Sequence, residues 1–108
     1  METFLQVVTT TASREEADAI SLALVEARLA ACVQVVGPIE SRYRWDGGVE
    51  VAQEWLCLAK TTGSRYPQME ATIRELHSYD VPEIVAVPVV MGSEPYLRWV
   101  GQETATPV

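Results

Sequence analysis

One stretch of the chain, residues 28–61, constrains the fold more than any other. Its two halves are rich in β-branched and aromatic residues, and Asp46-Gly47-Gly48 lies between them. Asp and Gly tolerate the positive φ that tight hairpin loops demand. The stretch therefore predicts one long β-hairpin, with arms over about residues 32–45 and 49–61.

The register of this hairpin is predicted from a three-residue loop, residues 46–48. That loop sets apolar residues opposite one another and makes one ion pair, which is how cross-strand pairs stabilise a sheet. The pairs are Trp45 with Val49, Tyr43 with Val51, Ile39 with Trp55, Val35 with Ala59, and Arg44 with Glu50. Gly37-Pro38 interrupts the first arm. Because Pro cannot donate to a central ladder, it predicts a bulge or an edge there.

The length of the hairpin predicts an assembly. An arm of about 14 residues at ~3.3 Å each reaches ~45 Å, whereas a folded chain of this size has a radius of gyration of about 13 Å. The tip should therefore overhang the core, and a bare apolar arm in water is an aggregation hazard. We expect the arm to pack on another subunit through Trp45, Val49, Val51 and Trp55.

The remaining segments complete a βαββαβ pattern. Residues 3–10 read as a strand, and Ser13 with Glu16 forms a capping box that opens a helix reaching about Arg28. A second helix ends near residue 78, residues 84–90 form a fourth strand with Pro88 at an edge or bulge, and residues 94–100 form a short helix that Gly101 ends. This order predicts an α+β fold, the ferredoxin-like sandwich of one antiparallel sheet with two helices on one face.

The strands are apolar on both faces. The runs VQVV, WLCLA and IVAVPVV do not alternate, although a sheet with one face in water should. Since only the short last helix is left to cover the second face, the pattern indicates that sheets of several copies associate.

Composition excludes several classes of protein. The net charge is −7, from fifteen acidic against eight basic residues, and nucleic-acid binding requires a basic face. No apolar run approaches the roughly 20 residues of a membrane span, and no signal-peptide pattern opens the chain. Cys32 and Cys57 lie inside apolar strands and are predicted to be two buried thiols without a disulfide. We expect a cytoplasmic protein that binds neither nucleic acid nor membrane.

Several blocks of the sequence resemble one family. The stretch ARLAACVQVVGPIESRYRWDGGVE, followed by LCLAKTT, LHSYDVPEIVAVPV and YLRWV, is similar to the CutA divalent-cation-tolerance proteins. The resemblance implies a single ferredoxin-like CutA domain over residues 1–102, a homotrimer with its sheets inside, and a link to copper and other divalent cations. Residues 103–108 are expected to be a loose tail.

The resemblance also implies candidate site residues. Copper-binding bacterial members look as if they use a Cys at the end of the first strand and a His-His pair before a Pro-Tyr. The matching positions here are Thr9, Leu76 and His77, with Ser78 in place of the proline. Only His77 carries over as a metal ligand, and a selective transition-metal site needs several soft or nitrogen donors. A His at a helix end is also a common partner of the helix dipole.

A second constellation resembles the polar cleft between subunits of the family. It comprises Lys60, Tyr79 and Glu83, with Tyr43 and Trp45 from the hairpin arm. Lys60 ends a buried strand, where a cation needs a carboxylate or a ligand anion to offset desolvation. Two interpretations stay open: a small-molecule or anion pocket with Glu83 as ion-pair partner, or a salt bridge with an aromatic clamp that locks the trimer.

The sequence offers little for catalysis. It has no Gly-rich phosphate loop, no zinc motif and no Ser-His-Asp spacing. Glu40, Glu50 and Glu54 alternate on the arm and read as solvated or interface-paired carboxylates. We therefore expect a non-enzymatic trimer tied to divalent-cation tolerance that binds copper weakly. The alternative is a trimeric small-molecule-binding signalling or scaffold module, by fold analogy with nitrogen-regulatory signal-transduction proteins.

Overall fold

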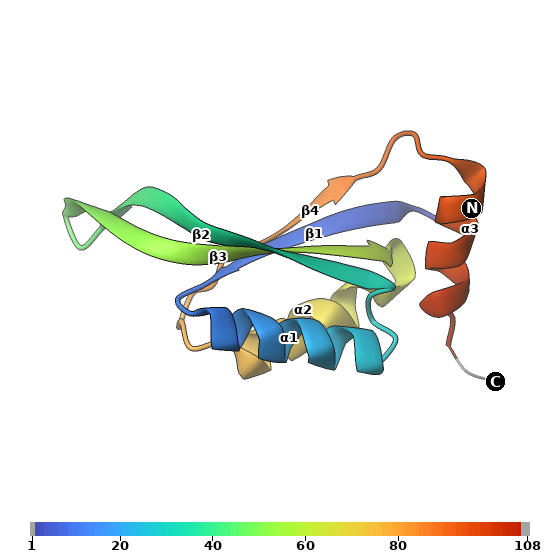
Figure 1. Cartoon of the computed structure of the whole chain (residues 1–108), viewed down its shortest axis with the longest axis horizontal. Helices are drawn as coiled ribbons and strands as arrows, with labels where there is room; N and C mark the ends of the chain where they lie inside the picture. Colours follow the sequence, from blue (N-terminus) through green and yellow to red (C-terminus); the bar gives the residue numbers. More distant parts are fainter. Residues whose placement is uncertain (1, 107–108) are drawn as a thin grey trace.

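The computed structural model describes residues 2–106 and has the predicted element order. Four strands and two long helices alternate as βαββαβ, and a third helix closes the chain (Figure 1). The elements are β1 (Phe4–Thr11), α1 (Arg14–Glu26), β2 (Cys32–Trp45), β3 (Gly48–Thr62), a 3₁₀ turn η1 (Gly63–Arg65), α2 (Tyr66–Leu76), β4 (Ile84–Pro88) and α3 (Glu94–Glu103). The predicted α+β class and two-layer architecture are confirmed.

The four strands form one antiparallel sheet in the order β2-β3-β1-β4. Both prolines inside strands, Pro38 in β2 and Pro88 in β4, therefore lie on edge strands of the sheet. An edge strand can leave one side of its ladder unpaired, which tolerates a missing N–H donor. The predicted edge position of Pro88 is confirmed.

The predicted hairpin exists, but its predicted register is wrong. Trp45 pairs with Gly48, and only Asp46 and Gly47 form the loop, with φ of 50° and 80°. Two consecutive positive φ angles are the requirement of the two-residue type I′ turn, whose twist matches that of the strands. The observed partners of the five predicted pairs are Trp45–Gly48, Arg44–Val49, Tyr43–Glu50, Ile39–Glu54 and Val35–Cys57. Turn geometry thus outweighed the apolar matching of side chains.

A bulge divides the hairpin into a core half and an arm half, as Gly37-Pro38 predicted. The register shifts between Val36 and Ile39, and the Gly37-Pro38 peptide is cis. The Trp55 ring lies so close to Gly37 that an added Cβ would stand 2.4 Å from Trp55 Cδ1. Glycine at position 37 is therefore what allows the Trp55 ring to cover the bulge.

Helices α1 and α2 cover one face of the sheet (Figure 1). Ser13 caps α1 by accepting the Glu16 N–H at 3.1 Å, as the capping box predicted. The core lies between these helices and the sheet, because the apolar residues of each helix recur on one side. It contains Val7, Ile20, Leu24, Leu29, Ala30, Ala59, Met69 and Ile73.

The C-terminal part of the chain departs from two predicted boundaries. Strand β4 ends at Pro88 rather than residue 90. Helix α3 runs through Gly101 to Glu103, and the Thr104 hydroxyl donates to the Val100 carbonyl at 2.7 Å. The prediction that Gly101 ends this helix is wrong, because Gly101 lies inside α3, two residues before its end. The first two residues of the predicted tail, 103–108, are thus ordered: Glu103 ends α3 and Thr104 is buried. Residues 107 and 108 lie outside the described part of the chain. The domain boundary at residue 102 stays a prediction.

The hairpin arm gives the molecule its long axis. The Cα atoms extend over 47 × 26 × 21 Å with a radius of gyration of 14.5 Å. The loop at Asp46-Gly47 projects well beyond the helices at one end, while α3 stands at the other (Figure 1). The predicted overhang of the arm is therefore confirmed for the single chain.

Candidate functional site

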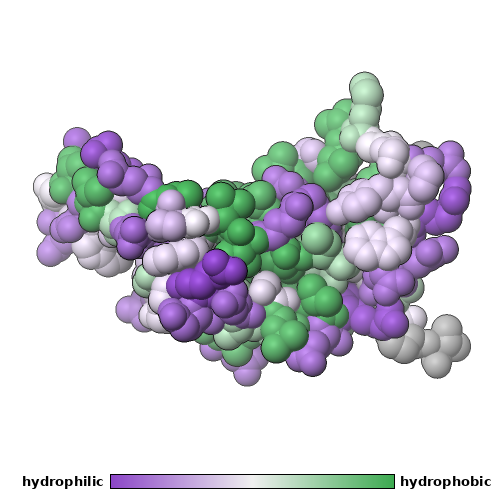
Figure 2. All heavy atoms as spheres, in the orientation of Figure 1, coloured by the Kyte–Doolittle hydropathy of each residue, from purple (hydrophilic) through white to green (hydrophobic). Residues whose placement is uncertain are grey.

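The face of the sheet opposite α1 and α2, here called the open face, is largely apolar. Val7 and Ala59 pair across strands and face the helices, so their neighbours along each strand point the other way. The outermost apolar residues of the open face are the most exposed: Val36 on β2 is 45% exposed, and Val85 and Val87 on β4 are 48% and 49% exposed. Figure 2 shows apolar residues along this hollowed side.

The hairpin arm carries a second group of exposed apolar residues. Tyr43, Trp45, Val49 and Val51 are 42%, 59%, 62% and 53% exposed. Trp55 differs from the other three predicted interface residues, because it is half-buried against Gly37 of its own chain. The arm thus presents three of the four predicted interface side chains to its surroundings.

The His77 side chain lies in a closed corner between the end of β1 and the start of α1. Its side chain is 0% exposed. The Tyr79 backbone N–H donates to His77 Nδ1 at 3.2 Å, which makes Nδ1 the acceptor. Nε2 then carries the proton and donates to the Thr10 carbonyl at 2.7 Å. Both ring nitrogens of His77 are therefore occupied by hydrogen bonds within the chain.

One carboxylate oxygen faces this corner without a partner. Glu16 Oε2 accepts the Ser78 N–H at 3.0 Å, but the buried Glu16 Oε1 has no hydrogen-bond partner in the described part of the chain. It lies 3.8 Å from His77 Nδ1. A cation placed there would meet one carboxylate oxygen and a nitrogen already bonded to Tyr79. Because a selective copper site needs several nitrogen or sulfur donors, these residues do not fit a resident copper ion.

Tyr79 joins the corner to the hairpin through a buried acid. Its hydroxyl donates to Glu54 Oε2 at 2.8 Å, and its ring lies 4.9 Å from the His77 ring. Glu54 is only 7% exposed. Burial, and then the hydrogen bond and charge of Glu54, raise the pKa of the Tyr79 hydroxyl. The prediction of a solvated carboxylate at Glu54 is wrong, because Glu54 is buried and bonded to Tyr79 of the same chain. The alternative of pairing across an interface stays a prediction.

The structure does not bring Lys60 and Glu83 together within one chain. Lys60 Nζ donates to Gln34 Oε1 at 2.8 Å. Lys60 pairs with Gln6, which pairs with Val87, four residues from Glu83. At strand spacing this separates the two residues by about 13 Å along β4 and about 10 Å across the sheet. An ion pair between them therefore requires two subunits.

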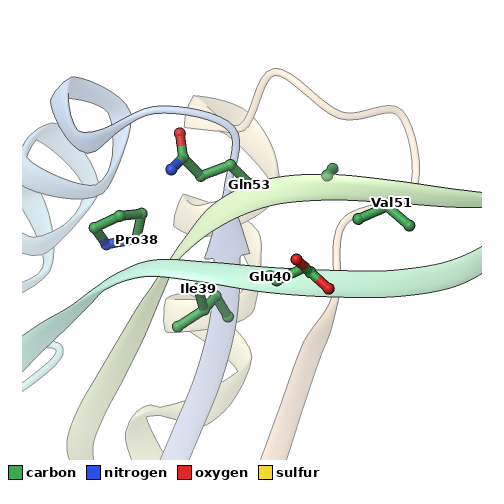
Figure 3. A pocket seen from close by; sticks show the side chains of 6 residues that line it. Pro38, Ile39, Glu40, Val51 and Gln53 are labelled. Carbon is green, nitrogen blue, oxygen red and sulfur yellow. The ribbon is translucent and has the colours of Figure 1, made fainter.

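A hollow of about 340 Å³ lies at the bulge of the hairpin. It lies between the strands β2 and β3 just beyond the register shift. Pro38 and Ile39 line it from β2, and Val51 and Gln53 line it from β3 (Figure 3). Of the predicted site residues only Val51 lines it. The hollow is therefore part of the arm surface and is separate from the His77 corner.

Comparisons with known proteins agree with this fold. The family model described as CutA1 divalent ion tolerance protein matches residues 5–103. The chain belongs to the CutA1 family. The divalent-cation tolerance protein CutA of Thermus thermophilus is 47% identical over 98 residues, which cover 91% of this chain and 95% of that protein. Protein CutA of Mus musculus is 45% identical over 85 residues, 79% of this chain and 48% of that protein.

Solved structures of CutA1 proteins share the whole architecture. The Thermus thermophilus structure has a TM-score of 0.91 and 46% identity over 97% of this chain and 100% of that chain. The CutA1 structure from Oryza sativa has a TM-score of 0.94 and 32% identity over 97% of this chain and 96% of that chain. The chain thus spans nearly all of these two structures and about half of the mouse protein's length.

The predicted burial of the two cysteine thiols is confirmed for Cys57 only. Cys57 is buried and Cys32 half-buried, and both are free thiols. Burial, with the charges of Asp18 and Glu16, raises the pKa of the Cys57 thiol to about 11. Within residues 2–106, no helix is long and apolar enough to cross a membrane.

Sequence reasoning missed the part-buried Glu16 and the buried Glu54 as carboxylates of this site. The sequence predicts a capping role for Glu16 and a solvated or interface-paired carboxylate at Glu54. Glu16 accepts a hydrogen bond from Ser78, just after the end of α2. No sequence signal predicts this contact, because the two residues are far apart in the chain. For Glu54, the only sequence signal is the Gly37-Pro38 bulge. A bulge shifts the pairing of the residues beyond it, and Glu54 pairs with Ile39 directly after the shift.

Proposed function

We propose that this chain is a non-enzymatic homotrimeric protein of the divalent-cation tolerance type. The observation that carries the proposal is the uncovered apolar surface: an open sheet face and a protruding arm, both rich in half-exposed apolar residues. Contiguous apolar surface of this kind marks an interaction site. Membership of the CutA1 family supports the cation-tolerance role.

Closed threefold assembly accounts for both surfaces at once. An arm that reaches beyond its own core can lie on a neighbouring subunit, while the open faces pack toward a common axis. Such packing would also allow Lys60 of one subunit to approach Glu83 of another. The proposed clefts between subunits then hold Lys60, Tyr79 and Glu83, with Tyr43 and Trp45 from an arm.

Light scattering tests the assembly. At low micromolar concentration the expected species has three times the chain mass of 11.9 kDa. A stable species of a single chain mass would overturn the trimer and every cleft assigned to it.

Weak binding of copper or another divalent cation is the second part of the proposal. The His77 and Glu16 geometry supports weak rather than tight binding, because a cation must displace the Tyr79 N–H from His77 Nδ1 to gain two donors. We expect calorimetric titration of the trimer with Cu²⁺ to give a low affinity that falls further in His77→Ala. Unchanged affinity in His77→Ala would exclude His77 as the ligand.

A small-molecule-binding signalling or scaffold module is the second candidate function. It is favoured by Lys60, whose ammonium has Gln34 as a partner but takes part in none of the ion pairs within residues 2–106. A thermal-shift panel of nucleotides and organic acids tests it, because a ligand that binds only the folded trimer must raise its melting temperature. A panel without any shift would count against this module.

The cellular location is part of the same proposal. We expect the protein in the cytoplasm, although the Archaeoglobus fulgidus structure is described as periplasmic and the Arabidopsis thaliana relative as chloroplastic. Fractionation of the native cells, with detection by antibody, tests this location. Recovery of the protein in a periplasmic or organellar fraction would contradict it.

A further inference from the structure

A pocket at the α3 end of the sheet has the features of a ligand site. This α3 pocket has a volume of about 220 Å³ and lies between α3, the first residues of β1 and the chain after β4. Its walls are mainly apolar and include Phe4, Leu5, Leu97 and Val100. Pockets for drug-sized ligands occupy roughly 300–1,000 Å³, so this one suits a smaller molecule.

The walls of the α3 pocket are held by direct contacts. The Val89 N–H donates to the Phe4 carbonyl at 2.9 Å, which ties the segment after β4 to β1. Gly92 lies so close to Leu97 that an added Cβ would stand 3.1 Å from its side chain. The pocket is thus formed by packed elements. It lies beside α3, which stands at one end of the sheet (Figure 1).

Lys60 places one positive charge at this apolar pocket. It is the only lysine in the chain, which carries fifteen acidic residues. Its Nζ donates to Gln34 Oε1 at 2.8 Å, and none of the ion pairs within residues 2–106 includes it. An ammonium group has three N–H donors. Within the single chain, Lys60 can therefore offer free N–H donors and a charge that no carboxylate compensates.

Tyr96 supplies a second donor from α3. It lines the pocket, and burial followed by the influence of Cys32 raises the pKa of its hydroxyl, so the hydroxyl keeps its proton at neutral pH. Cys32 stands directly opposite Lys60 on the β2–β3 ladder. Tyr96 and Lys60 therefore line the pocket from α3 and from the sheet.

We propose that the α3 pocket binds a small monocarboxylate with an apolar body. The two carboxylate oxygens accept hydrogen bonds from Lys60 and Tyr96, and the body lies among Phe4, Leu5 and Leu97. A single charge fits best, because one cation is available and the net charge of −7 repels polyanions. This site rests on the second candidate function, small-molecule binding at Lys60, and not on cation tolerance. A bound carboxylate would compete with Glu83 of a neighbouring subunit for the Lys60 ammonium.

Phenylacetate is the probe for this site in the natural assembly. Selective ¹³Cε-lysine labelling gives a single side-chain signal, because the chain has one lysine. We expect this signal to move saturably with millimolar phenylacetate. Acetate, which lacks the apolar body, and phenylacetamide, which lacks the charge, should each bind at least about tenfold more weakly.

Three variants locate the binding by calorimetry. Lys60→Met keeps the apolar stem and should lower the phenylacetate affinity about tenfold or more, since a charge-assisted hydrogen bond is lost. Tyr96→Phe should lower it a few-fold. Arg98→Met is the matched control, because it removes a positive charge from α3 at a residue that pairs with Glu94 outside the pocket. Its affinity should be unchanged.

Defined results would overturn this site. One is a lysine ¹³C signal that does not move saturably with phenylacetate. Another is an equal affinity for phenylacetamide and phenylacetate. A third is an equal loss of phenylacetate affinity in Lys60→Met and Arg98→Met when the melting temperatures of both variants are unchanged. A neighbouring subunit that fills the pocket would also abolish the shift and so refute the site. Chain mass and copper titration report on the proposed function separately.

Discussion

At the scale of single residues, Thr9 shows a buried polar atom without a partner. It is 2% exposed on β1, and its Oγ1 has no hydrogen-bond partner within the described residues. A buried hydroxyl in this state loses its hydration without compensation. We expect Thr9→Val, which replaces the hydroxyl by a methyl group of similar size, to raise the free energy of unfolding by about 1 kcal/mol. Urea unfolding of both proteins measures the difference.

Thr61 provides the matched control for this prediction. It is 0% exposed on β3, but its hydroxyl donates to the Leu29 carbonyl at 2.6 Å. Thr61→Val leaves that carbonyl unpaired and should lower the free energy of unfolding by about 1–3 kcal/mol. If Thr9→Val destabilises as much as Thr61→Val, the Thr9 hydroxyl has a partner after all.

Tyr79 makes a prediction about alkaline pH. Its pKa in the folded chain lies above the ordinary value of 10.0, first through burial and then through Glu54. As the pH rises above about 10, the unfolded chain releases the Tyr79 proton while the folded chain keeps it, so the free energy of unfolding falls. Tyr79→Phe should reduce this fall, as measured by chemical denaturation between pH 8 and 11.

Tyr43→Phe is the control for the alkaline prediction. Tyr43 is 42% exposed on the arm, whereas the Tyr79 hydroxyl is bonded to buried Glu54. Tyr43 is a minor cause of the raised Tyr79 pKa, after burial and Glu54, so Tyr43→Phe should reduce the alkaline fall in stability much less than Tyr79→Phe does. Equal slopes in the natural protein and in Tyr79→Phe would show that Tyr79 ionises alike in the folded and unfolded chain.

At the scale of elements, the bulge in the hairpin depends on one glycine. A Cβ at residue 37 would stand 2.4 Å from Trp55 Cδ1, so Gly37→Ala forces the Trp55 ring or the strand to move. We expect a loss of about 1–3 kcal/mol in the free energy of unfolding, as for other overpacked sites. Thermal and urea unfolding measure it.

Gly48 is the matched control in the same hairpin. A Cβ there meets only the Trp45 carbonyl oxygen, at 3.9 Å, an ordinary contact. Gly48→Ala should therefore change stability by no more than about 0.5 kcal/mol. The loss in Gly37→Ala should also shrink when Trp55→Ala is present. A loss that persists in the double variant would place the strain in the backbone rather than in the ring.

The elements also show what sequence reasoning can and cannot reach. Hairpin length, bulge and edge prolines followed from Gly37-Pro38, Pro88 and the loop residues, because each restricts the backbone locally. The register did not follow, because Asp46-Gly47-Gly48 is compatible with a two-residue or a three-residue loop. The positive φ angles of Asp46 and Gly47, which identify the two-residue loop, appear only in the structure. The face of each residue beyond a bulge depends on that register.

The candidate site was predictable in part. The strand end at Lys60 and the half-exposed Tyr43 and Trp45 on the arm follow from local pattern. The bond from Tyr79 to Glu54 does not, because it joins a loop to a strand 25 residues away in the sequence. The closed state of His77 likewise depends on Thr10, 67 residues away. Contacts of this range are set by the packing of whole elements.

At the scale of the whole molecule, the arm carries apolar side chains beyond the reach of the chain's own core. Val51 on the arm is 53% exposed, and Leu22 on α1 is 60% exposed. Neither contributes to the core cluster of the single chain. The proposed trimer distinguishes them, because it covers the arm and leaves the outer helices in water.

A glutamate at each position tests this distinction. A charge buried in an apolar interface without a partner costs several kcal/mol, so Val51→Glu should raise the dissociation constant of the assembly at least about a hundredfold. Leu22→Glu should leave the assembly intact. Light scattering across a dilution series measures both, and circular dichroism establishes that each variant is folded. If both variants keep the mass of the natural assembly, or Leu22→Glu dissociates it as readily as Val51→Glu, then the arm is not what holds the subunits together.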